Sequence, residues 1–248
     1  MAYLDEKNIE ERRGKLRYQR RLSSVKLGRQ LFGVELQPWG TVKHWCPTPY
    51  DESYSSTSSA LCHAYKIICK KLNTRDANWE PSRAWLAYWE THKFSGDEDV
   101  MSHAQKVGIC SHDLFTTDIS LQHNQDASKH RIRGYNTIPI DKNVISNVRH
   151  IISGGKPLLI SIHVYSGFES KHTAATGMVC LPKPGETYLG CIEMCIVGFT
   201  HHKKLFTVLC NRGADWGHHG FCYLPYEYVS NDHLVVNIGV IEVFNHKN

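Results

Sequence analysis

The spacing of apolar residues changes near Gly154, and this change limits the folds that the chain can adopt. Before Gly154, apolar residues recur at three- and four-residue steps, most regularly over 58–72, which predicts a helix. After it, the segments are β-branched, aromatic or alternating, which predicts strands. Helices followed by strands are typical of an α+β chain with two lobes.

The remaining elements follow from the same patterns. Further helices are predicted over 81–92, 100–107 and 143–153. Strands are predicted over 157–164, 190–199, 204–210, 219–224 and 234–243. The segment 110–135 is polar and is predicted to be irregular. The Ser/Thr run before the helix at 58–72 supplies N-cap candidates, and Ser58 is the one we expect to cap it.

Composition excludes several classes of protein. No apolar run approaches the length of a membrane span, and the first residues lack the apolar core of a secretory signal, so we expect an intracellular, reducing location. Nine cysteines, an odd number set mostly among apolar neighbours, favour buried reduced thiols over disulfides. The histidine pairs at 201–202 and 218–219 have no cysteines at ligand spacing, so neither a metal site nor a cofactor is expected.

Positive charge is concentrated at the start of the chain. We expect residues 1–40 to form an N-terminal arm outside a domain over 41–248. Eight basic residues and no acidic ones lie between positions 12 and 29. They are Arg12, Arg13, Lys15, Arg17, Arg20, Arg21, Lys26 and Arg29. The arm is either a solvated extension or a segment that docks on an acidic partner surface or on nucleic acid. Only Tyr18 is aromatic there, so stacking on bases is poorly supported.

Several segments, taken in their order along the chain, carry a resemblance. They are CPTPYD at 46–51, PSRAWLAYW at 81–89, KVGIC at 106–110, YSGFES at 165–170, TGMV at 176–179, LPKPGE at 181–186, GADWG at 213–217 and GFCYLPYEY at 220–228. Together they resemble the papain-like cysteine peptidases of bacteria and large DNA viruses over about 42–245. The resemblance implies a helical lobe at about 41–140, whose central helix packs on an antiparallel β-barrel-like lobe at about 141–248. The substrate cleft would lie between the lobes.

The resemblance also locates the four side chains that such peptidases use. A helix-start cysteine attacks the carbonyl, a histidine shares its proton, an asparagine orients the histidine, and a glutamine stabilises the oxyanion. In this sequence these positions are Ser58, Ile192, Cys210 and Glu52 respectively. All four depart from the family pattern. We therefore expect no catalytic residues at these positions and a pseudoenzyme without peptidase activity.

Rebuilding the site from neighbouring residues is not favoured by the sequence. Ser58 as a nucleophile would need a base, and Ile192 cannot be one. Glu193 should point to the opposite face of its strand from Ile192. Cys62 lies one helical turn beyond Ser58 among core-type residues, and a carboxylate at Glu52 would repel a developing oxyanion.

These observations predict a structural or interaction protein on a peptidase fold, with other proteins in a larger assembly as partners. A minor component of a virus particle, such as a minor capsid protein, is one concrete version. The alternative is a peptide-binding decoy or inhibitor that uses the interlobe cleft. Weaker alternatives are an active cysteine peptidase and a nucleic-acid binder acting through the arm.

Overall fold

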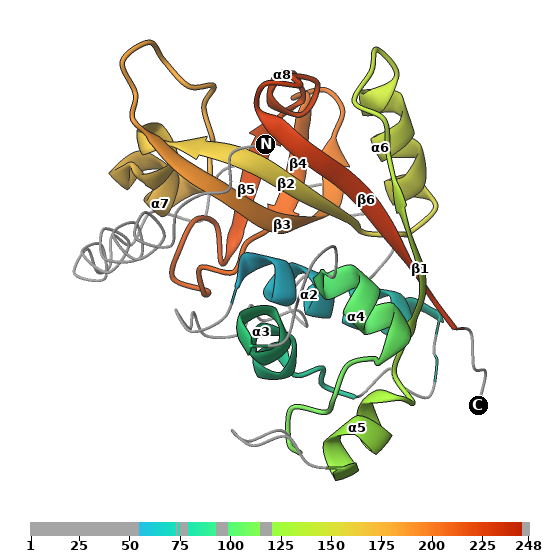
Figure 1. Cartoon of the computed structure of the whole chain (residues 1–248). Helices are drawn as coiled ribbons and strands as arrows, with labels where there is room; N and C mark the ends of the chain where they lie inside the picture. The colour runs from blue at the N-terminus through green and yellow to red at the C-terminus, as the bar shows by residue number, and fades with distance from the viewer. Residues whose placement is uncertain (1–54, 73, 75–78, 93–98, 115–120, 245–248) are drawn as a thin grey trace.

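The computed structural model describes residues 55–72, 74, 79–92, 99–114 and 121–244, so the basic arm and Glu52 lie outside the described residues. Within the described residues, four helices precede the first strand. They are α2 (Ser56–Leu72), α3 (Arg83–His92), α4 (Val100–Lys106) and α5 (Leu121–Ala127). In Figure 1 these helices lie on one side of a twisted sheet. Within this part of the chain, no helix combines the length and the apolar character needed to cross a membrane.

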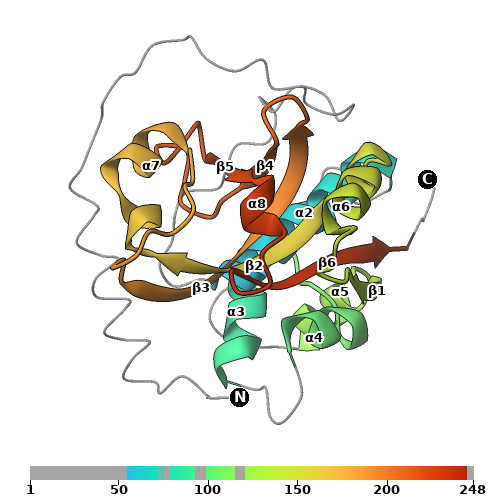
Figure 2. The same ribbon diagram turned by 90° about the horizontal axis from the view of Figure 1, so that it is seen from above.

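The sheet has six strands in the order β1-β6-β2-β3-β4-β5, and every neighbouring pair is antiparallel. Its strands are β1 (Ile132–Thr137), β2 (Leu158–Tyr165), β3 (Tyr188–Thr200), β4 (Leu205–Leu209), β5 (Phe221–Pro225) and β6 (Val235–Val243). Short helical segments connect them. These are α6 (Val144–Ser153), the 3-10 turn η3 (Ser166–Glu169), α7 (Lys171–Thr176) and α8 (Tyr226–Val229). Figure 2 looks onto the face of the sheet that carries α8, with α2 behind the strands.

Two hydrophobic cores lie on opposite faces of the sheet. On one face, α2 packs against side chains such as Leu159 of β2 and Cys195 of β3. On the other face, α6 packs against Ile160 and Met194 from the same two strands. This division follows from strand geometry, because successive side chains point to opposite faces. The helix that the apolar pattern predicts is therefore the central helix of the molecule, buried against the sheet.

The structure confirms the predicted order of helices followed by strands and corrects it in one region. The segment 110–135, predicted to be irregular, contains α5 and the start of β1. β1 is an edge strand in which only Ile132 is fully buried, so its sequence lacks a clear apolar alternation. A lobe boundary near residue 140 and an arm over 1–40 stay predictions.

Candidate functional site

The N-terminus of α2 meets the sheet at β3. The serine-rich run supplies the predicted cap, but the capping residue is Ser55, whose Oγ accepts a hydrogen bond from the Ser58 N–H at 3.0 Å. The prediction that Ser58 caps this helix is thus wrong by three residues, because the helix begins at Ser56 rather than at 58. The next serine joins helix to sheet: the Ser56 Oγ accepts a hydrogen bond from the Glu193 N–H at 3.0 Å.

Ser58 is buried inside the first turn of α2, where the resemblance places the nucleophile. Its hydroxyl donates to Oε2 of Glu90 in α3 at 3.3 Å and accepts from the Ser55 hydroxyl at 3.0 Å. Among the residues that the structure describes, no histidine hydrogen-bonds to Ser58. The hydroxyl is therefore paired with a carboxylate, and no motif in the sequence indicated Glu90 as this partner.

Glu193 lies on the face of β3 that is turned toward α2. Burial raises the pKa of its carboxyl, a hydrogen bond from the Thr57 side chain opposes this effect, and the nearby charge of Glu90 adds to it. Ile192 packs against the core on the other face of the sheet. This confirms the prediction that the side chains at positions 192 and 193 point to opposite faces of β3. We call Ser56, Ser58, Glu90 and Glu193 the interlobe site.

Cys210 and Cys62 lie in the two hydrophobic cores, one on each face of the sheet. Cys210 is buried in the sheet core, with its Sγ 3.3 Å from Sδ of Met194 and 3.2 Å from Sγ of Cys222. Cys62 is buried in α2, and burial raises the pKa of its thiol to about 12. That thiol is fully protonated near neutral pH, as expected for a core cysteine.

A second polar group lies on the α2-facing side of the sheet, two residues from Glu193 along β3. Nδ1 of His163 in β2 is 3.1 Å from Sγ of Cys191 in β3 and 3.0 Å from the hydroxyl of Tyr188. We call these three residues the thiol cluster. The prediction of buried thiols is wrong for Cys191 and for Cys180, which are both exposed. Sequence reasoning missed the cluster because only the strand register pairs His163 with Cys191.

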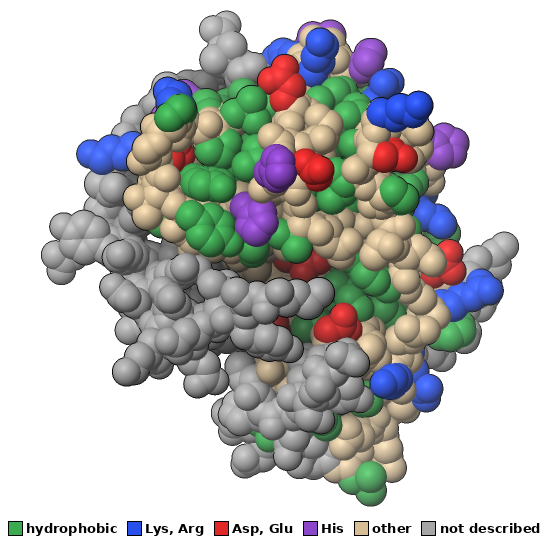
Figure 3. Space-filling view, turned by 45° about the horizontal axis from the view of Figure 1, so that its top comes forward, with side chains coloured by type: hydrophobic (Ala, Val, Ile, Leu, Met, Phe, Trp, Pro, Cys, Tyr) green, Lys and Arg blue, Asp and Glu red, His purple; other side chains and the backbone are tan. Residues whose placement is uncertain are grey.

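The surface at this junction is hollowed. Figure 3 shows a recess between the sheet-containing part and the helical part, with acidic side chains visible inside it. Two further acidic residues, Glu90 and the exposed Asp99, lie close enough to Glu193 for their charges to raise the pKa of its carboxyl. Over the described ranges, no group of three or more His, Cys, Asp or Glu side chains could hold a metal ion. The recess is thus an acidic surface suited to a cationic ligand.

Comparisons with known proteins agree on the fold. No protein-family model matches the chain. The chain is 26% identical over 208 residues to an uncharacterised peptidase C1-like protein of Acanthamoeba polyphaga mimivirus, covering 76% of this chain and 67% of that protein. It is similar to xylellain, a cysteine protease from Xylella fastidiosa, at 21% identity with a TM-score of 0.66, over 77% of this chain and 80% of xylellain. It is also similar to the bromelain protease of Ananas comosus at 13% identity with a TM-score of 0.56, over 83% of this chain and 97% of that one.

These similarities overturn one expectation. The prediction that the chain is not an enzyme is wrong as it stands, since the similar solved structures are cysteine proteases and the mimivirus relative is named a peptidase C1-like protein. The prediction weighed Glu52, Ser58, Ile192 and Cys210, and found no replacement for them in Cys62 or Glu193. It gave no weight to a thiol and an imidazole that the strand register brings together elsewhere on the same face. The chain has the papain-like fold, and its mimivirus relative supports a relationship to the papain-like cysteine peptidases.

Proposed function

We propose that the protein binds extended polypeptides at the interlobe site and favours basic ones. The observation that carries the proposal is the contact between the start of α2 and β3, made by the Ser56 Oγ and the Glu193 N–H. It brings a helix N-terminus and a strand together beside Glu90 and Glu193. The similarity to cysteine proteases, which act on polypeptides, supports the class of ligand.

Charge supports the preference for basic chains. Glu90 lies close enough to Glu193 for its charge to raise the pKa of the Glu193 carboxyl. A lysine or arginine side chain placed between two such carboxylates would be attracted to both. The same positive charge would lower the cost of ionising Glu193 in its partly buried position.

The proposal is tested by fluorescence anisotropy with labelled extended peptides that are rich in lysine and arginine or in alanine and serine. We expect saturable binding of the basic peptides. Glu193→Gln should weaken it about fivefold, which corresponds to about 1 kcal/mol. Glu227→Gln is the matched control, because Glu227 is exposed on α8 at the opposite face of the sheet. Equal binding by wild type and Glu193→Gln would contradict the proposal.

Cleavage of the bound peptide is measured in the same mixtures by mass spectrometry. Turnover that Ser58→Ala abolishes would assign the chemistry to the start of α2. Turnover that survives Ser58→Ala and is lost in Cys191→Ala would assign it to the thiol cluster. The paired variants separate these two sites because Ser58 and Cys191 share no hydrogen-bond partner among the described contacts.

Acidification gives an independent prediction for Glu193. Burial raises the pKa of this carboxyl above the ordinary glutamate value of 4.5, so Glu193 becomes neutral at a higher pH than an exposed glutamate does. When the solution is acidified, binding of a basic peptide should therefore begin to weaken before the pH has fallen to 4.5.

The same carboxyl affects the stability of the free protein. The folded state binds this proton more tightly than the unfolded state, so the contribution of Glu193 to stability falls as pH rises above 4.5. Thermal unfolding of Glu193→Gln should show less of this decline than wild type. Identical pH profiles would refute the assignment.

Docking through the basic arm stays a prediction, as does a place in a virus particle. The arm lies outside the described residues, and the mimivirus origin of the relative is a property of that protein. We propose that the arm contributes contacts to other proteins or to nucleic acid through its eight basic side chains. Deletion of residues 1–30 should reduce such binding and make the remainder less sensitive to salt.

A further inference from the structure

The thiol cluster lies on the same face of the sheet as the interlobe site. Across β2 and β3, Leu159 pairs with Cys195, Ser161 with Glu193, and His163 with Cys191. Leu159 and Cys195 belong to the core that α2 covers, so the other two pairs are turned the same way. Two residues along a strand span about 7 Å, which places the Cys191 backbone about that far from Glu193. The cluster therefore lies beside Glu193 along β3, on the same face of the sheet.

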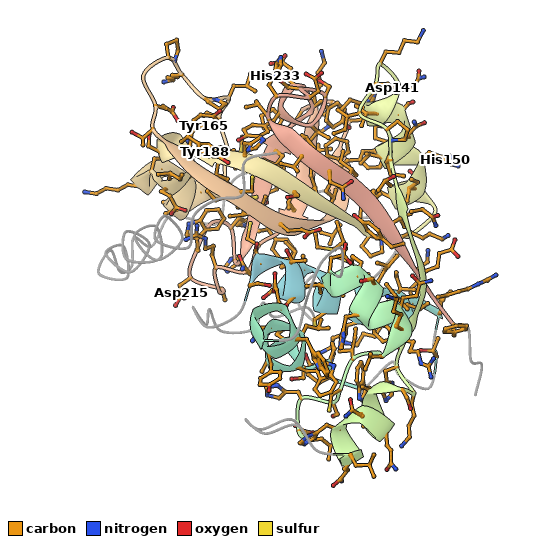
Figure 4. The ribbon with its side chains drawn as sticks, viewed as in Figure 1. Asp141, His150, Tyr165, Tyr188, Asp215 and His233 are labelled. Atoms are coloured by element: carbon orange, nitrogen blue, oxygen red, sulfur yellow. The ribbon has the colours of Figure 1, made fainter. Side chains whose placement is uncertain are left out.

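The three side chains contact one another in a closed triangle. The Cys191 Sγ is 3.1 Å from the His163 Nδ1 and 3.4 Å from the Tyr188 hydroxyl, which is itself 3.0 Å from the same Nδ1. Figure 4 shows Tyr188 beside Tyr165 at the end of the sheet near α7, and their ring centroids are 5.5 Å apart. The tyrosine ring is thus held in place by a packed neighbour rather than by the thiol alone.

The geometry of this triangle allows the imidazole to accept the thiol proton during a reaction. A neutral Nδ1 has one lone pair, which the thiol and the tyrosine hydroxyl cannot both use. When the thiol proton passes to Nδ1, the imidazolium N–H donates to the sulfur, and the tyrosine hydroxyl can donate to the sulfur as well. Both hydrogen bonds are then made to a charged acceptor. The arrangement places a base and a second donor where a thiolate would form.

We propose that Cys191 is a reactive thiol that exchanges with low-molecular-weight disulfides, and that the adduct blocks the interlobe site. In the reaction His163 takes the thiol proton, and the thiolate attacks one sulfur of the disulfide. A bond forms between the Cys191 sulfur and that sulfur. The second sulfur leaves as a thiolate and takes the proton from His163. The blocking of the interlobe site rests on the proposed function, whereas the exchange itself does not.

A matched control exists within the same chain. Cys180 is the other exposed cysteine in the described ranges, and it makes no hydrogen bond to a histidine there. Six further cysteines are buried, and burial raises the pKa of the thiols of Cys62 and Cys110 to about 12. Those six should react only after unfolding. Cys46 lies outside the described residues, and peptide mapping reports it separately.

The test is the initial rate of glutathionylation at each cysteine of the full chain in glutathione disulfide, followed by peptide mapping and mass spectrometry. We expect Cys191 to react about tenfold faster than Cys180. His163→Asn should lower the rate at Cys191 about tenfold and leave Cys180 unchanged, and Tyr188→Phe should lower it by a factor of about three. Circular dichroism confirms that each variant is folded.

Two results would overturn the reactive thiol: equal rates at Cys191 and Cys180 in wild type, or a rate at Cys191 that neither variant changes. The second half of the proposal is tested by peptide anisotropy after glutathionylation. We expect modified wild type to lose binding and Cys191→Ala treated in the same way to keep it. Fast exchange without loss of binding would refute only the blocking role, and slow exchange would refute the reactive thiol whether or not peptides bind.

Discussion

Replacing Trp85 by alanine should lower the free energy of unfolding by about 4 kcal/mol, the largest effect we expect from a single substitution. The Trp85 side chain is fully buried in α3, and its ring packs edge-on against Trp89 with the centroids 5.7 Å apart. Its indole Nε1–H donates to the carbonyl oxygen of Gly108 at 3.0 Å. Alanine would leave both a cavity and an unpaired buried carbonyl. Urea unfolding followed by far-ultraviolet circular dichroism measures the loss without relying on tryptophan emission.

Trp85→Phe separates the two contributions. Phenylalanine keeps most of the ring volume and removes the donor to Gly108, so a loss of about 2 kcal/mol is expected. Because α3 also carries Glu90, Trp85→Ala should weaken peptide binding at the interlobe site beyond its effect on stability. A Trp85→Ala protein as stable as wild type would contradict the packing of α3 described above.

Replacing Leu61 by alanine should cost about 3 kcal/mol of unfolding free energy. Leu61 is fully buried one turn after the start of α2, in the core that this helix shares with Leu159 and Cys195. Removing its side chain leaves a cavity at the contact between the helix and the sheet. Chemical denaturation measures the change, and the slope of the transition should stay constant if the variant unfolds in two states.

The control for Leu61 lies at the other end of the same helix. Leu72 is 40% exposed, so Leu72→Ala should change stability by less than about 0.5 kcal/mol. Similar losses for the two variants would mean that α2 is not the buried central helix of the fold. If Leu61→Ala loses much of its unfolding free energy but its folded fraction still binds peptide, then Leu61 contributes to stability and not to peptide recognition.

The parts of the fold that could be predicted from the sequence are those with a strong local pattern. The apolar steps over 58–72 predicted α2 to within two residues at its start, because one face of this helix is buried from Ser58 to Cys69. β6 and β3 were predicted nearly in full, since both are rich in β-branched and apolar residues. β1 was missed because an edge strand needs little burial, and its backbone is held by pairing with β6.

The candidate site was less predictable, for a physical reason. Glu90 reaches Ser58 across 32 positions in sequence, and His163 reaches Cys191 across 28. Such contacts depend on helix packing and strand register, which no short motif encodes. The family pattern drew attention to Ile192, whereas the side chains on the α2-facing side of β3 are those of its neighbours on either side, Cys191 and Glu193. A one-residue difference in a strand exchanges the two faces of the sheet.

Hydrogen–deuterium exchange with and without a basic extended peptide tests the central claim most directly. If the interlobe site binds polypeptide, the peptide should slow exchange at the start of α2, over 55–60, and along β3, over 190–195. Exchange at α8 (Tyr226–Val229), on the opposite face of the sheet, should not change. Saturating peptide that leaves 55–60 and 190–195 unprotected, or that protects only α8, would contradict binding at this site.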